Sequence, residues 1–106
     1  MRNGMYKVEF ATPRGAGYGI VILNNGKVQG GDTSMYYNGT YQMTGDQFKG
    51  SVTVRRHSAA LPSVFGLDDL TINLSGKGSD DQGQLTGTSP QVPGVSLQAR
   101  LKRLAD

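Results

Sequence analysis

The chain consists of short stretches in which apolar and polar residues alternate, and each stretch ends at glycine or at a turn that contains glycine. Side chains of a β-strand point alternately to its two faces, so a period of two is typical of half-buried strands. The pattern runs from Gly4 to Arg103, and no segment has the period of a long amphipathic helix. The sequence therefore predicts an all-β protein.

About eight antiparallel strands are expected in sequence order. Asn24-Asn25-Gly26 predicts a tight hairpin turn, because asparagine and glycine tolerate the positive φ angles that such a turn requires. A meander of this size removes its exposed edges by closing on itself, so we expect a small up-and-down β-barrel of lipocalin-like form. With 106 residues, the chain is expected to be a single β-barrel domain over residues 1–106. The expected strands are residues 4–11, 18–23, 27–29, 35–43, 47–57, 70–74, 83–88 and 95–101.

Residues 58–69 interrupt the alternation, and we expect one short helical turn there that caps a barrel end. Arg55 and Arg56 precede this connection, and Asp68 and Asp69 lie at its far end. Opposite charges at both ends of one connection favour ion pairs. We expect these pairs to tie the connection to the preceding strand.

Residues that most enzymes use are scarce. The chain has one histidine, His57, one glutamate, Glu9, and no cysteine. Nucleophilic, acid–base and metal-binding sets each need several such groups together. We therefore expect no catalytic residue, no metal site and no cofactor.

The charge distribution argues against nucleic-acid binding. The net charge is +3, but the one basic cluster, Arg55-Arg56-His57, is divided between the two faces of a strand. The longest apolar run, Ile20-Val21-Ile22-Leu23, is too short to cross a membrane, so no membrane association is expected. The lack of cysteine, and an N-terminus unlike a signal peptide, favour a cytoplasmic location.

Aromatic side chains are the strongest candidates for a binding site. An eight-stranded barrel is wide enough for one small apolar ligand, although its interior can also be filled completely by side chains. Both alternatives are open at this point. The residues predicted to line the interior are Phe10, Tyr18, Tyr37, Tyr41 and Phe48.

The second expected strand is apolar on both faces. If Tyr18, Ile20 and Ile22 point inward, then Val21 and Leu23 point outward. An apolar outer face needs another protein surface to cover it. We therefore predict a homodimer in which Val21 and Leu23 form the interface.

Several short motifs follow one another in a recognisable order: Asn3-Gly4-Met5-Tyr6, Gly19-Ile20-Val21, Gly26, Gly30-Gly31-Asp32, Tyr37-Asn38-Gly39 and Pro62-Ser63-Val64. This order resembles the GrlR family, bacterial proteins that act as negative regulators of type III secretion. The likeness covers roughly the first two thirds of the chain. It implies a lipocalin-like barrel that forms a homodimer and acts without catalysis by binding a protein, a transcriptional regulator in that family. The family's best-known member has an acidic run in the turn between the fourth and fifth strands, whereas this chain has Thr44-Gly45-Asp46-Gln47, with a single acidic residue. If that run recognises the basic partner regulator, we expect the partner to be lost or changed here.

Three functions follow as hypotheses. The first is a non-catalytic binding or regulatory protein that acts on a protein partner or holds a small apolar ligand. The second is a small barrel enzyme that uses tyrosines and Arg56 for proton transfer, which requires a tyrosine with a shifted pKa. The third is a structural β module with a packed interior.

Overall fold

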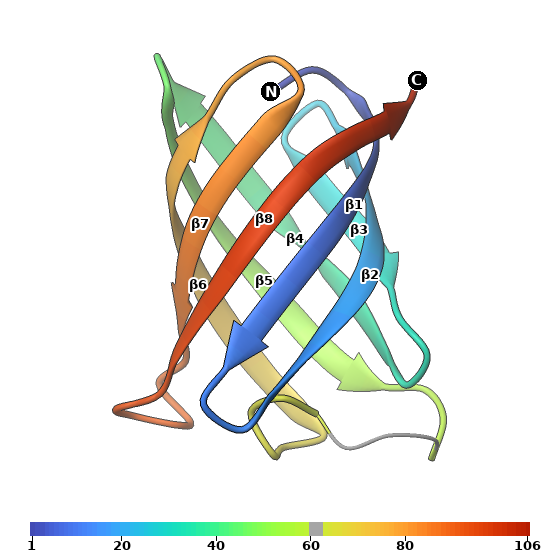
Figure 1. Ribbon diagram of the computed structural model, residues 1–106, viewed down its shortest axis with the longest axis vertical. Coiled ribbons are helices and arrows are strands. Elements are labelled where there is room, and N and C mark those ends of the chain that lie inside the picture. Colours follow the sequence, from blue (N-terminus) through green and yellow to red (C-terminus); the bar gives the residue numbers. More distant parts are fainter. Residues whose placement is uncertain (60–62) are drawn as a thin grey trace.

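The computed structural model describes residues 1–59 and 63–106, and these residues form eight strands and no helix. The strands make one closed antiparallel barrel in which each strand pairs with its neighbours in sequence order (Figure 1). This confirms the expected up-and-down β-barrel. The strands are β1 (Gly4–Thr12), β2 (Gly15–Asn24), β3 (Lys27–Gly31), β4 (Met35–Thr44), β5 (Gln47–Arg56), β6 (Asp69–Gly78), β7 (Gln82–Thr88) and β8 (Ser96–Ala105).

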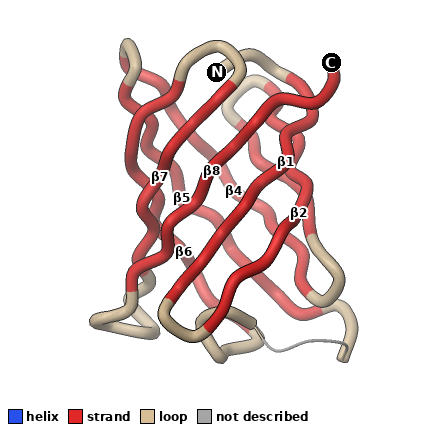
Figure 2. Tube along the Cα trace, viewed as in Figure 1, coloured by secondary structure: helices blue, strands red, loops and turns tan. Residues whose placement is uncertain are grey.

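The barrel closes where the last strand meets the first. β8 pairs with β1 from Met5 opposite Ala105 to Ala11 opposite Gln98, with a register shift between Met5 and Tyr6. Strands form the wall, and loops lie at the two ends (Figure 2). Closure gives every strand a neighbour on both sides over part of its length, which removes the long open edges of a flat sheet.

The turn between β2 and β3 has the predicted geometry. Asn25 and Gly26 have φ angles of 51° and 85°, the left-handed pair that a primed hairpin turn requires. The Gly26 carbonyl accepts a hydrogen bond of 2.8 Å from the Tyr41 amide. The turn is therefore also fixed to β4.

The connection from β5 to β6 contains a turn and no helix in its described residues. The Gly66 amide donates to the Ser63 carbonyl at 2.9 Å. The expected helical turn in residues 58–69 is absent from 58–59 and 63–69, and the rest of that prediction falls on residues 60–62, which lie outside the described residues.

Both predicted ion pairs at this connection are confirmed. Arg56 Nε lies 2.7 Å from Asp68 Oδ1, and Arg55 Nε lies 3.4 Å from Asp69 Oδ1. The aspartates are largely exposed, so each pair contributes little to the free energy of unfolding. Their role is to align β5 with the start of β6.

The predicted orientation of β2 was wrong. Val21 and Leu23 are 5% and 1% exposed and belong to the core, whereas Tyr18 is 70% exposed and Ile20 and Ile22 point outward with it. Residues paired directly across two antiparallel strands share a face. Tyr6 pairs with Val21, and the inward side of β1 therefore fixes the inward side of β2.

Close approach between β4 and β5 depends on Gly39. A Cβ atom at this position would lie 2.0 Å from the Ser51 carbonyl oxygen and 2.7 Å from the Val52 Cα. Both are backbone atoms in a paired strand, so neither can rotate away. The absence of a side chain lets the wall of the barrel bend tightly here.

Replacing Gly39 with alanine is expected to lower the free energy of unfolding by about 2 kcal/mol, because the paired backbones must separate. Urea unfolding followed by circular dichroism measures the change. Gly15→Ala is the matched control, since its Cβ would meet only Val64 Cγ1 at 4.0 Å. Equal midpoints for the two variants would contradict the assigned role of Gly39.

Candidate functional site

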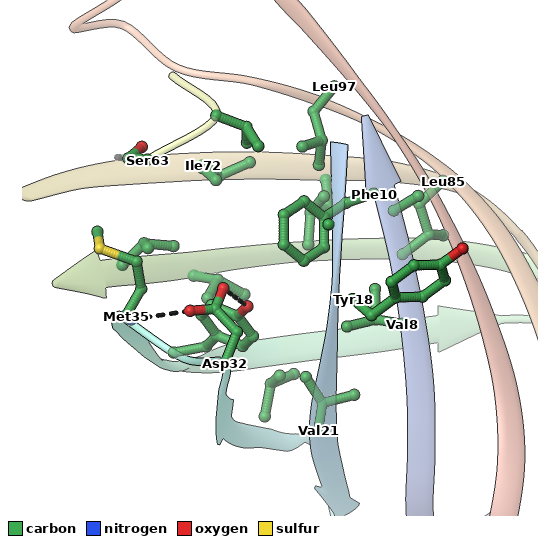
Figure 3. Close-up of a pocket in the computed structure, with 18 of the residues that line it drawn as sticks. Val8, Phe10, Tyr18, Val21, Asp32, Met35, Ser63, Ile72, Leu85 and Leu97 are labelled. Carbon is green, nitrogen blue, oxygen red and sulfur yellow. Dashed lines mark hydrogen bonds between the residues drawn. The ribbon is translucent and has the colours of Figure 1, made fainter. Parts of the chain in front are cut away.

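The barrel interior contains a cavity of about 430 Å³. This volume lies within the range of about 300 to 1,000 Å³ that is typical of small-molecule sites. All eight strands contribute to its wall. Most of the lining side chains are aliphatic or aromatic, and Figure 3 shows part of this lining. Central members of the wall are Val8, Val52, Ile72, Leu85, Leu97 and Ala99.

Aromatic packing closes one end of the cavity, the end that carries both chain termini (Figure 1). Tyr6 is fully buried, and its hydroxyl lies 2.6 Å from the Arg2 carbonyl oxygen and 3.0 Å from that of Asp80. The rings of Tyr41 and Phe48 stack with centroids 5.2 Å apart. Because these groups are buried and satisfied, this end is part of the core.

The opposite end of the cavity reaches the surface beside β2. β2 pairs with β1 along Gly15–Leu23, but with β3 only along Ile20–Asn24. The cavity is lined there by Ala16, Gly17 and Tyr18 of β2 and by residues 32–34 between β3 and β4. We call this region, residues 16–18 and 32–34, the mouth.

Asp32 is the centre of a hydrogen-bonded loop at the mouth. Its Oδ1 accepts from the backbone amides of Ser34 and Met35 at 2.9 and 2.8 Å. Its Oδ2 accepts from the Tyr37 hydroxyl. The backbone oxygen of Asp32 accepts from His57 Nε2 at 3.0 Å, which links the loop to the residue after β5. The carboxylate is thereby held in one position.

Tyr37 lies between this loop and the glycine-rich start of β2. A Cβ atom on Gly19 would lie 2.8 Å from the Tyr37 hydroxyl oxygen, so the ring occupies space that a side chain at Gly19 would need. Burial, the hydrogen bond to Asp32 and the negative charge of that carboxylate raise the pKa of Tyr37 above its ordinary value. Tyr37 therefore acts as a neutral hydrogen-bond donor.

Four of the five predicted lining residues border the cavity. Phe10, Tyr37 and Phe48 lie inside the barrel, and Tyr18 lies at the mouth. Tyr41 is buried at the closed end, beyond the lining. Tyr18 is at the rim of the mouth, but its side chain is exposed, which corrects the prediction that it points into the barrel.

Sequence reasoning missed Asp32 and the aliphatic wall. Gly30-Gly31-Asp32 marked only a break between strands, because aspartate is common in turns for conformational reasons. A signal that could have identified Asp32 is its spacing from Tyr37, which lies five residues later in the chain. In β4 Tyr37 occupies an inward position, where a buried hydroxyl needs a partner.

Groups needed for the enzyme hypothesis lie apart. Arg56 pairs with Asp68 and donates to the Ser58 carbonyl at 2.9 Å, and it does not line the cavity. Burial raises the pKa of Tyr6, as it does that of Tyr37, which makes both tyrosines poorer proton donors and harder to ionise. Within residues 1–59 and 63–106, no group of three or more His, Cys, Asp or Glu side chains is placed to hold a metal ion.

No protein-family model and no curated protein matches this chain. Among the described residues there is also no helix with the length and apolar character needed to cross a membrane. The site must therefore be interpreted from its own geometry.

Alkaline titration tests the raised pKa of Tyr37. The rise in tyrosinate absorbance near 295 nm is followed through the ordinary tyrosine pKa of about 10. Tyr37→Phe should leave the rise near wild type as long as the protein stays folded. Ionisation of Tyr37 well below pH 10 would contradict this and support the enzyme hypothesis.

Proposed function

We propose that this protein is a non-catalytic binding protein that holds one small, mostly apolar molecule inside its barrel. The observation that carries the proposal is the cavity of about 430 Å³, with walls built mainly from aliphatic and aromatic side chains. A barrel of this width can also be packed shut. Here the inward positions of β2 nearest the mouth are glycines, Gly17 and Gly19, which leave room for the rings of Phe10 and Tyr37. The interior still contains the unfilled cavity.

Physical chemistry favours an apolar ligand in such a site. Removing apolar surface from water contributes about 25 cal/mol per Å², so each 100 Å² of ligand surface buried contributes about 2.5 kcal/mol. The wall consists of hydrogen-bonded strands, so few groups need to be ordered when the ligand enters. We expect affinities on the order of micromolar for small apolar molecules.

We propose, as a second function, self-association through the outer face of β1 and β2. Met5, Ile20 and Ile22 are each more than a third exposed, and Tyr18 extends the same face towards the mouth. Met5 is paired directly with Ile22 across the two strands. This cluster supports the homodimer that the sequence suggested, with outward residues of β2 in place of Val21 and Leu23.

A second copy of the chain suits this face because the face carries both charges. Lys7 Nζ lies 3.3 Å from Glu9 Oε1, beside the apolar residues on β1. A twofold axis sets the same patch against itself, so Lys7 of one copy can approach Glu9 of the other. An interaction with a protein regulator, the role implied by the resemblance, would use the same outer surface.

Ligand binding is tested by filling the cavity. Ala99→Phe places a ring at an inward position of β8 and should weaken binding of the fluorescent apolar probe N-phenyl-1-naphthylamine by at least about tenfold. Fluorescence titration measures the affinity. Ala11→Phe makes the same change at an exposed position of β1 and should bind the probe like wild type. Equal binding by both variants would place the probe outside the barrel.

Self-association is tested by adding charge to the proposed interface. Ile22→Asp should convert a dimer into a monomer, because burying an unpaired carboxylate in the interface is energetically unfavourable. Light scattering coupled to size-exclusion chromatography measures the mass. Thr40→Asp introduces the same charge at an exposed position of β4 and should leave the dimer intact. A wild-type protein that is monomeric at all concentrations would refute the interface.

A further inference from the structure

Asp32 stands out chemically from the rest of the cavity wall. It is the one charged side chain among the described residues that line the cavity. The wall on every strand is otherwise apolar or neutral, and Asp32 is half-buried at the mouth. Because one side of Asp32 faces apolar side chains, its charge is screened less than that of a fully exposed carboxylate.

Several other aspartates of the chain form ion pairs with arginine. Asp68, Asp69 and Asp81 each form an ion pair with an arginine side chain. Asp32 has no such pair within the described part of the chain. The nearby ring of His57 contacts the Asp32 backbone oxygen, and its other nitrogen lies 2.7 Å from Ser58 Oγ. In the described part of the chain, this carboxylate is therefore not paired with a lysine or arginine side chain.

The Asp32 carboxylate also has spare capacity to accept a hydrogen bond. A carboxylate offers about four acceptor positions. Two backbone amides occupy Oδ1, and the Tyr37 hydroxyl occupies one position on Oδ2. One position on Oδ2 is left for a donor from another molecule.

We propose that Asp32 selects a ligand with a cationic, hydrogen-bonding head group, such as an alkyl ammonium, on an apolar tail. The tail occupies the aliphatic wall, and the head group lies at the mouth against Oδ2 of Asp32. An anionic head group on the same tail meets an uncompensated like charge and is disfavoured. The inference rests on the proposed binding function. It further specifies the charge of the ligand's head group.

Three amphiphiles with one tail test the inference. Dodecylammonium chloride, 1-dodecanol and sodium dodecanoate, each below its micelle concentration at pH 7, are used to displace N-phenyl-1-naphthylamine. Wild type should bind dodecylammonium on the order of tenfold more tightly than dodecanoate, with dodecanol between them. Asp32→Asn keeps an acceptor for the two amides and should bring the three affinities within about twofold of one another.

One further variant controls for charge. Asp46→Asn removes one negative charge in the β4–β5 turn, outside the cavity lining, and should keep the wild-type preference. Equal affinities for all three amphiphiles in wild type, or an unchanged preference in Asp32→Asn, overturn the inference while the binding function stands. No binding of the probe or of any amphiphile overturns both.

Discussion

The pairing of β8 with β1 is the constraint on which the rest of the structure depends. Once the sheet closes, each residue of a strand points either into the barrel or away from it, and directly paired residues share that choice. Tyr6 points inward on β1, so Val21 on β2 must do the same. Closure therefore determines which residues build the cavity and which remain on the outer surface.

Local signals explain why much of the fold could be predicted from the sequence. Alternation and turn residues act over a few positions, and Asn25 and Gly26 alone specify a primed turn. The ion pairs of Arg55 and Arg56 follow from charges at the two ends of one connection. The orientation of β2 could not be obtained in this way, because both of its faces are apolar. It required the register with β1, in which the inward Tyr6 is opposite Val21.

The cavity could not be predicted from the sequence. Whether a barrel is open or filled depends on the sum of inward side-chain volumes across all strands, and no short sequence pattern reports that sum.

Several residues in the motifs of the resemblance have structural roles in this barrel. Gly26 forms a turn, Asp32 fixes a loop, and Gly39 allows two backbones to approach. Short motifs of this kind follow from the geometry of a small barrel and carry little information about its partner.

Under the proposed binding function, the mouth is the region where residues can set ligand selectivity without changing the core. Residues of the wall, such as Phe48 and Leu70, are also buried members of the core, so changing them to suit a ligand lowers stability as well. The mouth loop is held by hydrogen bonds from Asp32 to Ser34 and Met35 and by the bond from the His57 amide to the Ser34 carbonyl at 2.9 Å. These bonds keep the Asp32 carboxylate in place before any ligand arrives. Because the carboxylate is already fixed, no conformational entropy is lost in ordering it when a ligand binds, and the core is unchanged. The head group of a ligand would therefore be selected at the mouth, and its tail would be selected only by size.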